Sequence, residues 1–238
     1  MPAIKIEQWF QNKQSVVSAV VPFDKKIDHL LALDFNSLNL DLIAEVIEDT
    51  DRFSAYIVGK IKTKNAKYGI GGYDEHRTVY QRSKVFDGSN TDEEPRRLHL
   101  GIDIWGEAGT PVFAVLNGVV HSFAFNDRYG DYGATIILQH TLDGFSFHSL
   151  YGHLSLKDLT GLQEGKSVLA GEEIAHFGEP IENGHWPPHL HLQLIIDMEG
   201  MKGDYPGVCR FSEREKYLAN CPNPDLLLNM MECTSSSL

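Results

Sequence analysis

Two histidines stand one residue apart in the strand-like run "PHLHLQLIID", close to residue 190. Because side chains alternate faces along a strand, the intervening leucines would form one buried face, while His189, His191 and Gln193 would share the other. Two imidazoles about 7 Å apart along a strand suit a metal site or an acid–base site. A half-buried strand that carries histidines on its solvated face is the alternative.

A second group with ligand chemistry is the run "HLGID", which extends from His99 to Asp103. Imidazole and carboxylate both bind zinc, but positions four apart in a straight strand are separated by about 13 Å. That distance is too long for two bonds of about 2 Å to a single ion. Gly101 would permit a bend or bulge that brings both side chains to one side. On its own, the run favours a turn that carries an exposed acid over a metal site.

A third histidine, His153, ends the strand-like run "FSFHSLYGH". Taken alone, it is a single histidine near the end of a strand. Its position gains meaning only from the order of the motifs around it.

The ordered set "HLGID", "AGTPVFAVLNGVV", "LYGHLS" and "GHWPPHLH" resembles the lysostaphin-type (LytM-like) zinc peptidases, which include peptidoglycan hydrolases. The resemblance extends from about Leu98 to Asp197, somewhat under half of the chain. It implies a mainly β fold with an antiparallel sheet core and a Zn²⁺ ion in a groove. The strand-like runs and the turn residues between them predict the same fold class.

The resemblance also implies a role for each motif residue. His99, Asp103 and His191 would bind Zn²⁺, and His153 and His189 would be the catalytic pair. Two histidines and one aspartate leave the fourth tetrahedral position open, which is typical of a catalytic zinc site. Which of the two catalytic histidines acts as the general base is left open by the sequence.

The predicted function is therefore that of a zinc metalloendopeptidase that hydrolyses an amide bond in a peptide or a muropeptide-like substrate. Two alternatives remain at this point. One is a cytoplasmic zinc amidase that acts on a small metabolite, and the other is a non-catalytic zinc-binding regulatory module. Such modules usually lack one or more of the five key residues, whereas all five are present in this chain.

Four further residues are candidates for binding substrate: Tyr73, Arg77, Arg97 and Trp186. Tyr73 and Arg77 lie in "GGYDEHRTVYQRS", and arginine is suited to bidentate binding of a carboxylate. Arg97 belongs to a short basic stretch, and Trp186 in "HWPP" would narrow the rim of the groove. The alternative for residues 71–83 is an ordinary strand with a charged face.

The composition limits the partners of the protein. The chain has 238 residues, of which 42% are hydrophobic and 23% charged, as in ordinary globular domains. Its formal net charge of -12 argues against a nucleic acid or an anionic membrane as partner, because either would require a basic face.

The cysteines and the N-terminus predict a compartment. Cys209, Cys221 and Cys233 are odd in number and lack metal-ligand spacing, so we expect free thiols, with a Cys209–Cys221 bridge as the alternative. The first residues lack the basic start and long apolar run of a signal peptide. These features predict a cytoplasmic protein, and a periplasmic or secreted protein is the alternative.

Changes in residue type and spacing along the chain predict three regions. Residues 1–88 form a mixed helical and hairpin region, residues 89–200 the zinc peptidase β core, and residues 201–238 an extension that packs on the core. Within the first region, residues 23–35 have helix-like spacing. The runs "FSAYIVGKIKT" and "KYGIGGY" predict a hairpin around residues 64–65, with a helix as the alternative for the first run.

Overall fold

A nine-stranded sheet organises the computed structural model, which describes residues 3–12, 16–88 and 92–235. The strand order is β13-β1-β2-β4-β11-β8-β7-β6-β9. The bounds of these strands are β1 Leu30–Leu33, β2 Tyr68–Gly71, β4 Ile102–Trp105, β6 Gly118–Asn126, β7 Gly133–Leu142, β8 Phe145–Leu154, β9 Ser167–Val168, β11 His189–Ile195 and β13 Thr234–Ser235. Two small two-stranded sheets add β3 Leu98–His99, β5 Pro111–Phe113, β10 Glu173–His176 and β12 Val208–Cys209.

The sheet is antiparallel except at one edge, where β1 pairs in parallel with both β2 and β13. The mainly β, antiparallel fold predicted from the sequence is therefore confirmed. The strands β1 and β2, which come from the first 88 residues, extend the same sheet that contains the later strands. The proposed division of the chain at residues 88 and 200 stays a prediction.

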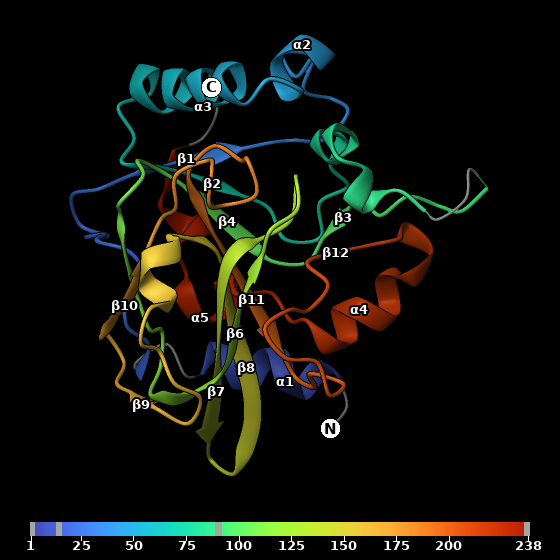
Figure 1. The fold of residues 1–238 in the computed structure, drawn as a ribbon. Coiled ribbons are helices and arrows are strands. Elements are labelled where there is room, and N and C mark those ends of the chain that lie inside the picture. Colours follow the sequence, from blue (N-terminus) through green and yellow to red (C-terminus); the bar gives the residue numbers. More distant parts are fainter. Residues whose placement is uncertain (1–2, 13–15, 89–91, 236–238) are drawn as a thin grey trace.

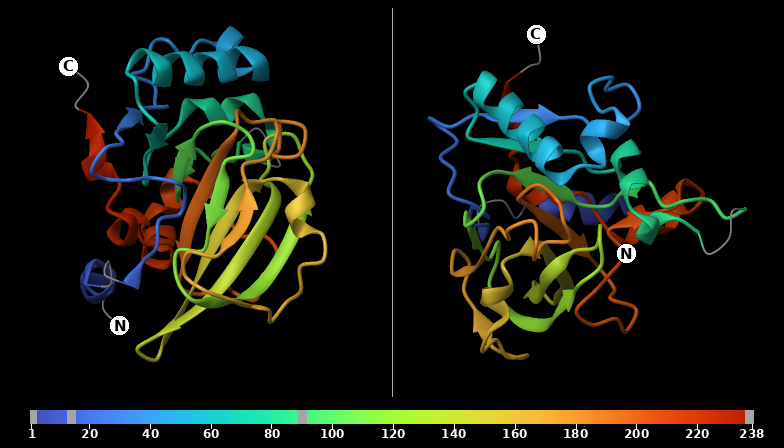
Figure 2. Two further views of the ribbon diagram at one scale, coloured as in Figure 1. Left: turned by 90° about the vertical axis from the view of Figure 1, so that its left-hand side faces the viewer. Right: turned by 45° about the horizontal axis from the view of Figure 1, so that its top comes forward.

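The helices are short and lie around the sheet (Figure 1). The α-helices are α1 Ala3–Gln11, α2 Ala44–Ile47, α3 Thr50–Thr63, α4 Arg214–Asn220 and α5 Asp225–Leu228. The 3₁₀ segments are η2 Thr78–Arg82, η3 Lys84–Phe86, η4 Leu156–Leu159, η5 Phe211–Glu213 and η6 Met231–Cys233. Figure 2 shows α3 at one end of the molecule and α1 at the opposite end. Within the described part of the chain, no helix has the length and apolar character needed to cross a bilayer.

Helix α3 takes the place of the first strand of the predicted hairpin, as in the helical alternative for that run, whereas residues 68–71 form strand β2. The side chain of Asp49 caps its first turn by accepting a hydrogen bond from the helix backbone (3.0 Å). Phe53, Ile57 and Ile61 are buried at intervals of four residues, which gives the helix one apolar face. This face packs against side chains of β1. Along the chain, α3 lies between β1 and β2, which pair in parallel.

The helix-like spacing of residues 23–35 is a second prediction that proves wrong. Residues 30–33 form strand β1, and Asp24 lies in a turn in which its carboxylate accepts a hydrogen bond from the backbone of Lys26 (2.9 Å). The physical reason is tertiary: β2 pairs with residues 30–33 on one side and β13 pairs with Leu30 and Leu31 on the other, which satisfies backbone groups of this segment.

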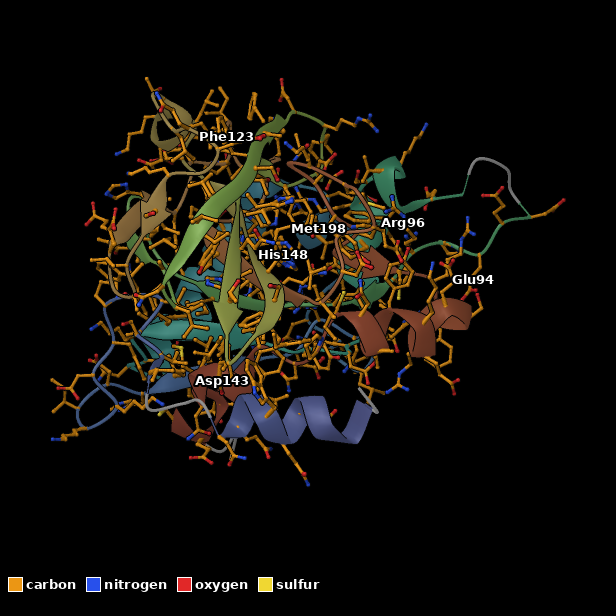
Figure 3. The ribbon with its side chains drawn as sticks, turned by 90° about the horizontal axis from the view of Figure 1, so that it is seen from below. Glu94, Arg96, Phe123, Asp143, His148 and Met198 are labelled. Carbon is orange, nitrogen blue, oxygen red and sulfur yellow. The ribbon has the colours of Figure 1, made fainter. Side chains whose placement is uncertain are left out.

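The hairpin of β7 and β8 is covered at its tip by α1. The ring of Trp9 lies 5.2 Å from that of Phe145, and Phe10 lies 5.0 Å from Phe147. Figure 3 shows α1 on this side, near the labelled Asp143 in the hairpin turn. The site lies at the opposite end of these strands, where His153 is near the end of β8.

Candidate metal centre and catalytic pair

Strand β11 is a central strand, bounded by β4 and β8, and both of its faces are buried. Its leucines belong to the main hydrophobic core. The pairing register places His191 opposite Asp103 of β4 and His189 opposite Trp105. The strand therefore presents two histidines to a carboxylate that lies 88 positions earlier in the chain.

The predicted bend at Gly101 separates β3 from β4 and brings His99 back toward Asp103. A Cβ atom on residue 101 would lie 2.6 Å from Cε1 of His191 and 2.6 Å from the carbonyl oxygen of Leu192. Contacts this short do not occur in folded proteins, so only glycine fits between the two ligand strands.

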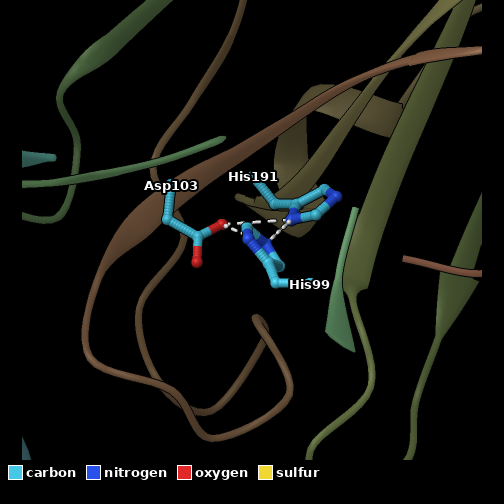
Figure 4. A group of neighbouring side chains, drawn as sticks. All are labelled: His99, Asp103 and His191. Atoms are coloured by element: carbon cyan, nitrogen blue, oxygen red, sulfur yellow. Dashed lines mark hydrogen bonds and ion pairs between the residues drawn. The ribbon is translucent and has the colours of Figure 1, made fainter. Parts of the chain in front are cut away.

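His99, Asp103 and His191 meet as one buried group (Figure 4). Nε2 of His99 lies 3.0 Å from Nδ1 of His191 and 3.3 Å from Oδ1 of Asp103. The same Oδ1 lies 3.0 Å from Nδ1 of His191. Three ligand atoms, one each from β3, β4 and β11, thus converge on one point.

Hydrogen bonds behind the group fix which ring nitrogen of each histidine faces it. Nδ1 of His99 is 2.9 Å from the carbonyl oxygen of Gly72, which can only accept, so this nitrogen carries the proton. Nε2 of His191 lies 3.0 Å from Oε1 of Gln193. The amide nitrogen of Gln193 donates to the carbonyl oxygen of Pro206 (3.1 Å), which sets the orientation of that amide. The lone pairs of His99 Nε2 and His191 Nδ1 therefore both point into the group.

The remaining oxygen of Asp103 is occupied by an arginine. Nη1 of Arg77 forms an ion pair with Oδ2 of Asp103, and Nε of Arg77 bonds to Oε2 of Glu75 at 2.6 Å. Burial by itself raises the pKa of Asp103, but the neighbouring His99 and Arg77 outweigh it and hold this pKa well below its usual range. Asp103 is therefore an anion that offers one oxygen to the group.

This arrangement fits a metal ion. With both ring protons directed outward, two imidazole lone pairs and a carboxylate oxygen approach to about 3 Å with no proton between them. Burial lowers the pKa of His99 to about 4, so this ring does not relieve the crowding by taking up a proton at neutral pH. Two imidazoles and one carboxylate are a donor set typical of Zn²⁺.

Two further histidines lie beside the metal-binding group. Nδ1 of His153 bonds to the carbonyl oxygen of Asn183 (2.8 Å), and Nδ1 of His189 to that of Pro187 (2.7 Å). The rings are 4.1 Å apart between centroids, and Nε2 of His189 lies 4.0 Å from Oδ1 of Asp103. Both rings thus have their Nδ1 protons fixed by backbone and their Nε2 lone pairs free for chemistry.

Burial keeps both of these rings neutral at physiological pH. It lowers the pKa of His189 to about 4, and burial together with His189 lowers the pKa of His153 well below its usual value. Trp105 stacks on His189 with a centroid distance of 3.8 Å, which fixes the plane of this ring. His153 has a φ of 62°, a left-handed conformation that is uncommon outside glycine and is found at functional sites.

A cavity of about 170 Å³ opens onto this arrangement and is lined by Asp103, His153, His189 and His191. Of the four predicted substrate-binding residues, Arg77 and Trp186 line the cavity. The remaining walls come from parts of the segments 79–86 and 128–132, from residues 204–208, and from Arg96 and Trp105.

The other two substrate-binding candidates are engaged elsewhere. The hydroxyl of Tyr73 donates to the carbonyl oxygen of Cys221 (2.6 Å), and Arg97 pairs with Asp87 (2.7 Å). Neither is among the residues that line the cavity, whereas Arg96, next to Arg97, is. Their predicted roles have no support in these contacts.

Residues 97–202 match the family model of Peptidase family M23. This chain contains an M23 peptidase domain. The match confirms the lysostaphin-type resemblance seen in the sequence. The M23 domain includes all five histidine and aspartate residues of the site, whereas Gly72, Arg77 and Pro206, which support it, lie outside the matched region.

The chain is also similar to curated proteins. Over 102 residues the chain is 36% identical to an uncharacterized metalloprotease of Haemophilus influenzae, which covers 42% of this chain and 19% of that protein. It is 35% identical over 101 residues to a DD-carboxypeptidase/endopeptidase of Neisseria meningitidis, covering 42% of this chain and 21% of the relative. The chain thus spans about a fifth of the length of these relatives.

Among solved structures, lysostaphin from Staphylococcus simulans is similar to this chain, with 26% identity and a TM-score of 0.38. The superposition covers 60% of this chain and 47% of that chain.

Proposed function

We propose that this protein is a zinc-dependent metalloendopeptidase that hydrolyses a peptide bond. His99, Asp103 and His191 hold the metal in this proposal, and His153 and His189 act on the substrate. One observation carries it: three ligand atoms converge without a proton between them, directly beside two histidines whose Nε2 atoms are free.

When bound, Zn²⁺ supplies a Lewis acid that activates water and polarises the scissile carbonyl. The protein's own contribution lies in the two neutral histidines. With Nδ1 protonated and bonded to a carbonyl, each can accept a proton at Nε2 and stay oriented while positively charged. One ring would take the proton of the attacking water, and the other would stabilise the developing oxyanion or protonate the leaving amine.

Arg77 has a positioning role in this proposal. Its guanidinium is almost completely buried and bonded to both Glu75 and Asp103, so it holds the ligand carboxylate by one oxygen. Trp186, which lines the cavity, is proposed to contact the substrate.

The substrate class belongs to the proposal as well. The relatives include a DD-carboxypeptidase/endopeptidase and an L-Ala–D-Glu endopeptidase of Bacillus subtilis, which support a peptide of the muropeptide type. We propose no nucleic-acid or membrane partner, in line with the net charge of -12. We propose that the protein acts in the cytoplasm, which its three free cysteines support.

The test is cleavage of two matched panels, one of muropeptides and one of ordinary peptides, followed by mass spectrometry of the products. The purified protein should cleave members of one panel, lose this activity with a chelator and regain it with zinc. His121→Ala, which alters a strand residue of β6 away from the five site residues, is the matched control and should stay active. Turnover that is indifferent to the chelator would disprove the proposal.

A further inference from the structure

Trp105 packs directly against one of the two catalytic histidines. It is the last residue of β4 and pairs with His189 of β11 in the sheet. The indole and the imidazole are nearly parallel, with an angle of 15° between their planes and 3.8 Å between their centroids. Both side chains are almost completely buried, so the stack is shielded from solvent.

The other contacts of His189 leave the tilt of its ring open. The hydrogen bond from Nδ1 to the carbonyl oxygen of Pro187 holds the ring at one atom only. The neighbouring ring of His153 is inclined by 31° and offers no parallel surface. The torsion that turns an imidazole about its Cβ–Cγ bond has broad minima, whereas a catalytic group must be held within about 10–20° of its productive orientation. The flat contact with Trp105 therefore restrains the direction of Nε2 of His189.

The contribution of Trp105 comes from the face of its ring. Its indole nitrogen is buried and forms no hydrogen bond within the described residues. A buried donor without an acceptor is unfavourable, so this N–H adds nothing to the stability of the site. Phenylalanine at this position would therefore keep a flat ring against His189 and remove no hydrogen bond.

Residues outside the M23 domain hold Trp105 in turn. The ring of Trp105 lies 5.3 Å from that of Phe35, which follows β1, and 6.1 Å from that of Phe53 in α3. The two phenylalanine rings are 5.9 Å apart, and both are completely buried. All three side chains belong to one hydrophobic cluster. Trp105 thus links the first part of the chain to a catalytic side chain.

We propose that Trp105 is a positioning residue for catalysis, which keeps Nε2 of His189 directed at the substrate, and that Phe35 and Phe53 keep Trp105 in place. The inference rests on the proposed metallopeptidase function. It implies that the M23 domain alone is not the complete catalytic unit of this protein, because the first part of the chain sets the geometry of the catalytic pair.

Two substitutions of Trp105 test this role in zinc-saturated protein, with a peptide that the wild type cleaves. Trp105→Leu removes the flat ring and should lower kcat about 10–100-fold, the scale expected when a reacting group is misplaced by about 1 Å. KM and zinc content should stay close to those of the wild type. Trp105→Phe should restore most of kcat. Phe147→Leu, which removes a buried ring of β8 that packs against α1, is the matched control and should keep kcat.

A double-mutant cycle tests the support from α3. Phe53→Leu should lower kcat in the wild-type background but change it little in the Trp105→Leu background, because both substitutions act through the same contact with His189. Independent, multiplicative effects of the two substitutions would contradict the proposed link from α3 to the catalytic pair.

NMR relaxation of the His189 ring carbons measures the restraint without a substrate. The ring should be rigid in the wild type and in Trp105→Phe, and mobile in Trp105→Leu. If Trp105→Leu does not fold, Phe53→Leu gives the same readouts with Trp105 still present. An equally rigid ring in the leucine variant, an unchanged kcat, or an equal loss of kcat in Phe147→Leu would overturn the positioning role. A wild-type protein that holds zinc but cleaves no peptide would instead refute the metallopeptidase proposal, and the NMR result would still decide the role of Trp105.

Discussion

Replacing Gln193 tests how the protein prepares His191 to bind metal. Gln193→Leu removes the acceptor of the His191 Nε2–H and the donor to the carbonyl oxygen of Pro206, leaving the buried ring of His191 and the half-buried carbonyl of Pro206 without these partners. Each such loss costs about 1–3 kcal/mol. The ring is then free to protonate at Nδ1 and direct that proton into the ligand group. We expect zinc affinity to fall about 10–100-fold, the scale seen when a partner behind a ligand is removed.

Gln193→Glu is the informative companion variant. A carboxylate still accepts the His191 Nε2–H and strengthens this bond by its charge, although it loses the donor to Pro206. We expect its zinc affinity to stay much closer to that of the wild type. Gln139→Leu, a substitution on β7, is the matched control.

Zinc competition with a chelator gives the affinities, and ¹⁵N NMR of the imidazoles gives the tautomer of His191 directly. The wild type should show a proton on Nε2 of His191, and the leucine variant should show loss of this preference. An unchanged affinity and an unchanged tautomer in Gln193→Leu would refute the reasoning.

Three further predictions concern catalysis, acid stability and location. His153→Ala and His189→Ala should each keep zinc yet lose hydrolysis by about 10²–10⁴-fold, as metal analysis and kinetics of both variants will show; loss of zinc from either would contradict its role. Burial lowers the pKa of His140 to about 4, against about 6.5 in an unfolded chain, so the unfolded state binds this proton first. Stability contributed by neutral His140 is therefore complete above pH 6.5 and falls by up to about 3 kcal/mol toward pH 4, and denaturation curves of His140→Gln should lack this part of the decline. Fractionation of cells should recover the native protein with the cytosol, and recovery from the periplasm or medium would oppose the proposed location.

The chemistry of the site was accessible from the sequence because it depends on local patterns. Alternation along "PHLHLQLIID" gave two faces, and Gly101 allowed the bend that brings His99 to Asp103. The meeting of Asp103 with His191 was not accessible from spacing alone, because it depends on the register between β4 and β11. Only the resemblance to a known family supplied it.

Other features of the structure have no local signal. The carbonyl oxygens of Gly72 and Pro206 orient two side chains of the site, directly or through Gln193, but a backbone group leaves no trace in the sequence. The walls of the cavity come from residues 79–86 and 204–208, which only the tertiary fold brings together. In α3, β-branched and aromatic residues suggested a strand, whereas the spacing of four between buried positions and the cap at Asp49 decide for a helix.

The most direct test of the central claim is a crystal structure of the zinc-loaded protein with anomalous data collected at the zinc edge. We predict one strong peak about 2.0–2.2 Å from Nε2 of His99, Oδ1 of Asp103 and Nδ1 of His191, with the Nε2 atoms of His153 and His189 close by but outside bonding distance. A peak at the cysteines, or one bonded to His189 in place of His191, would contradict the account.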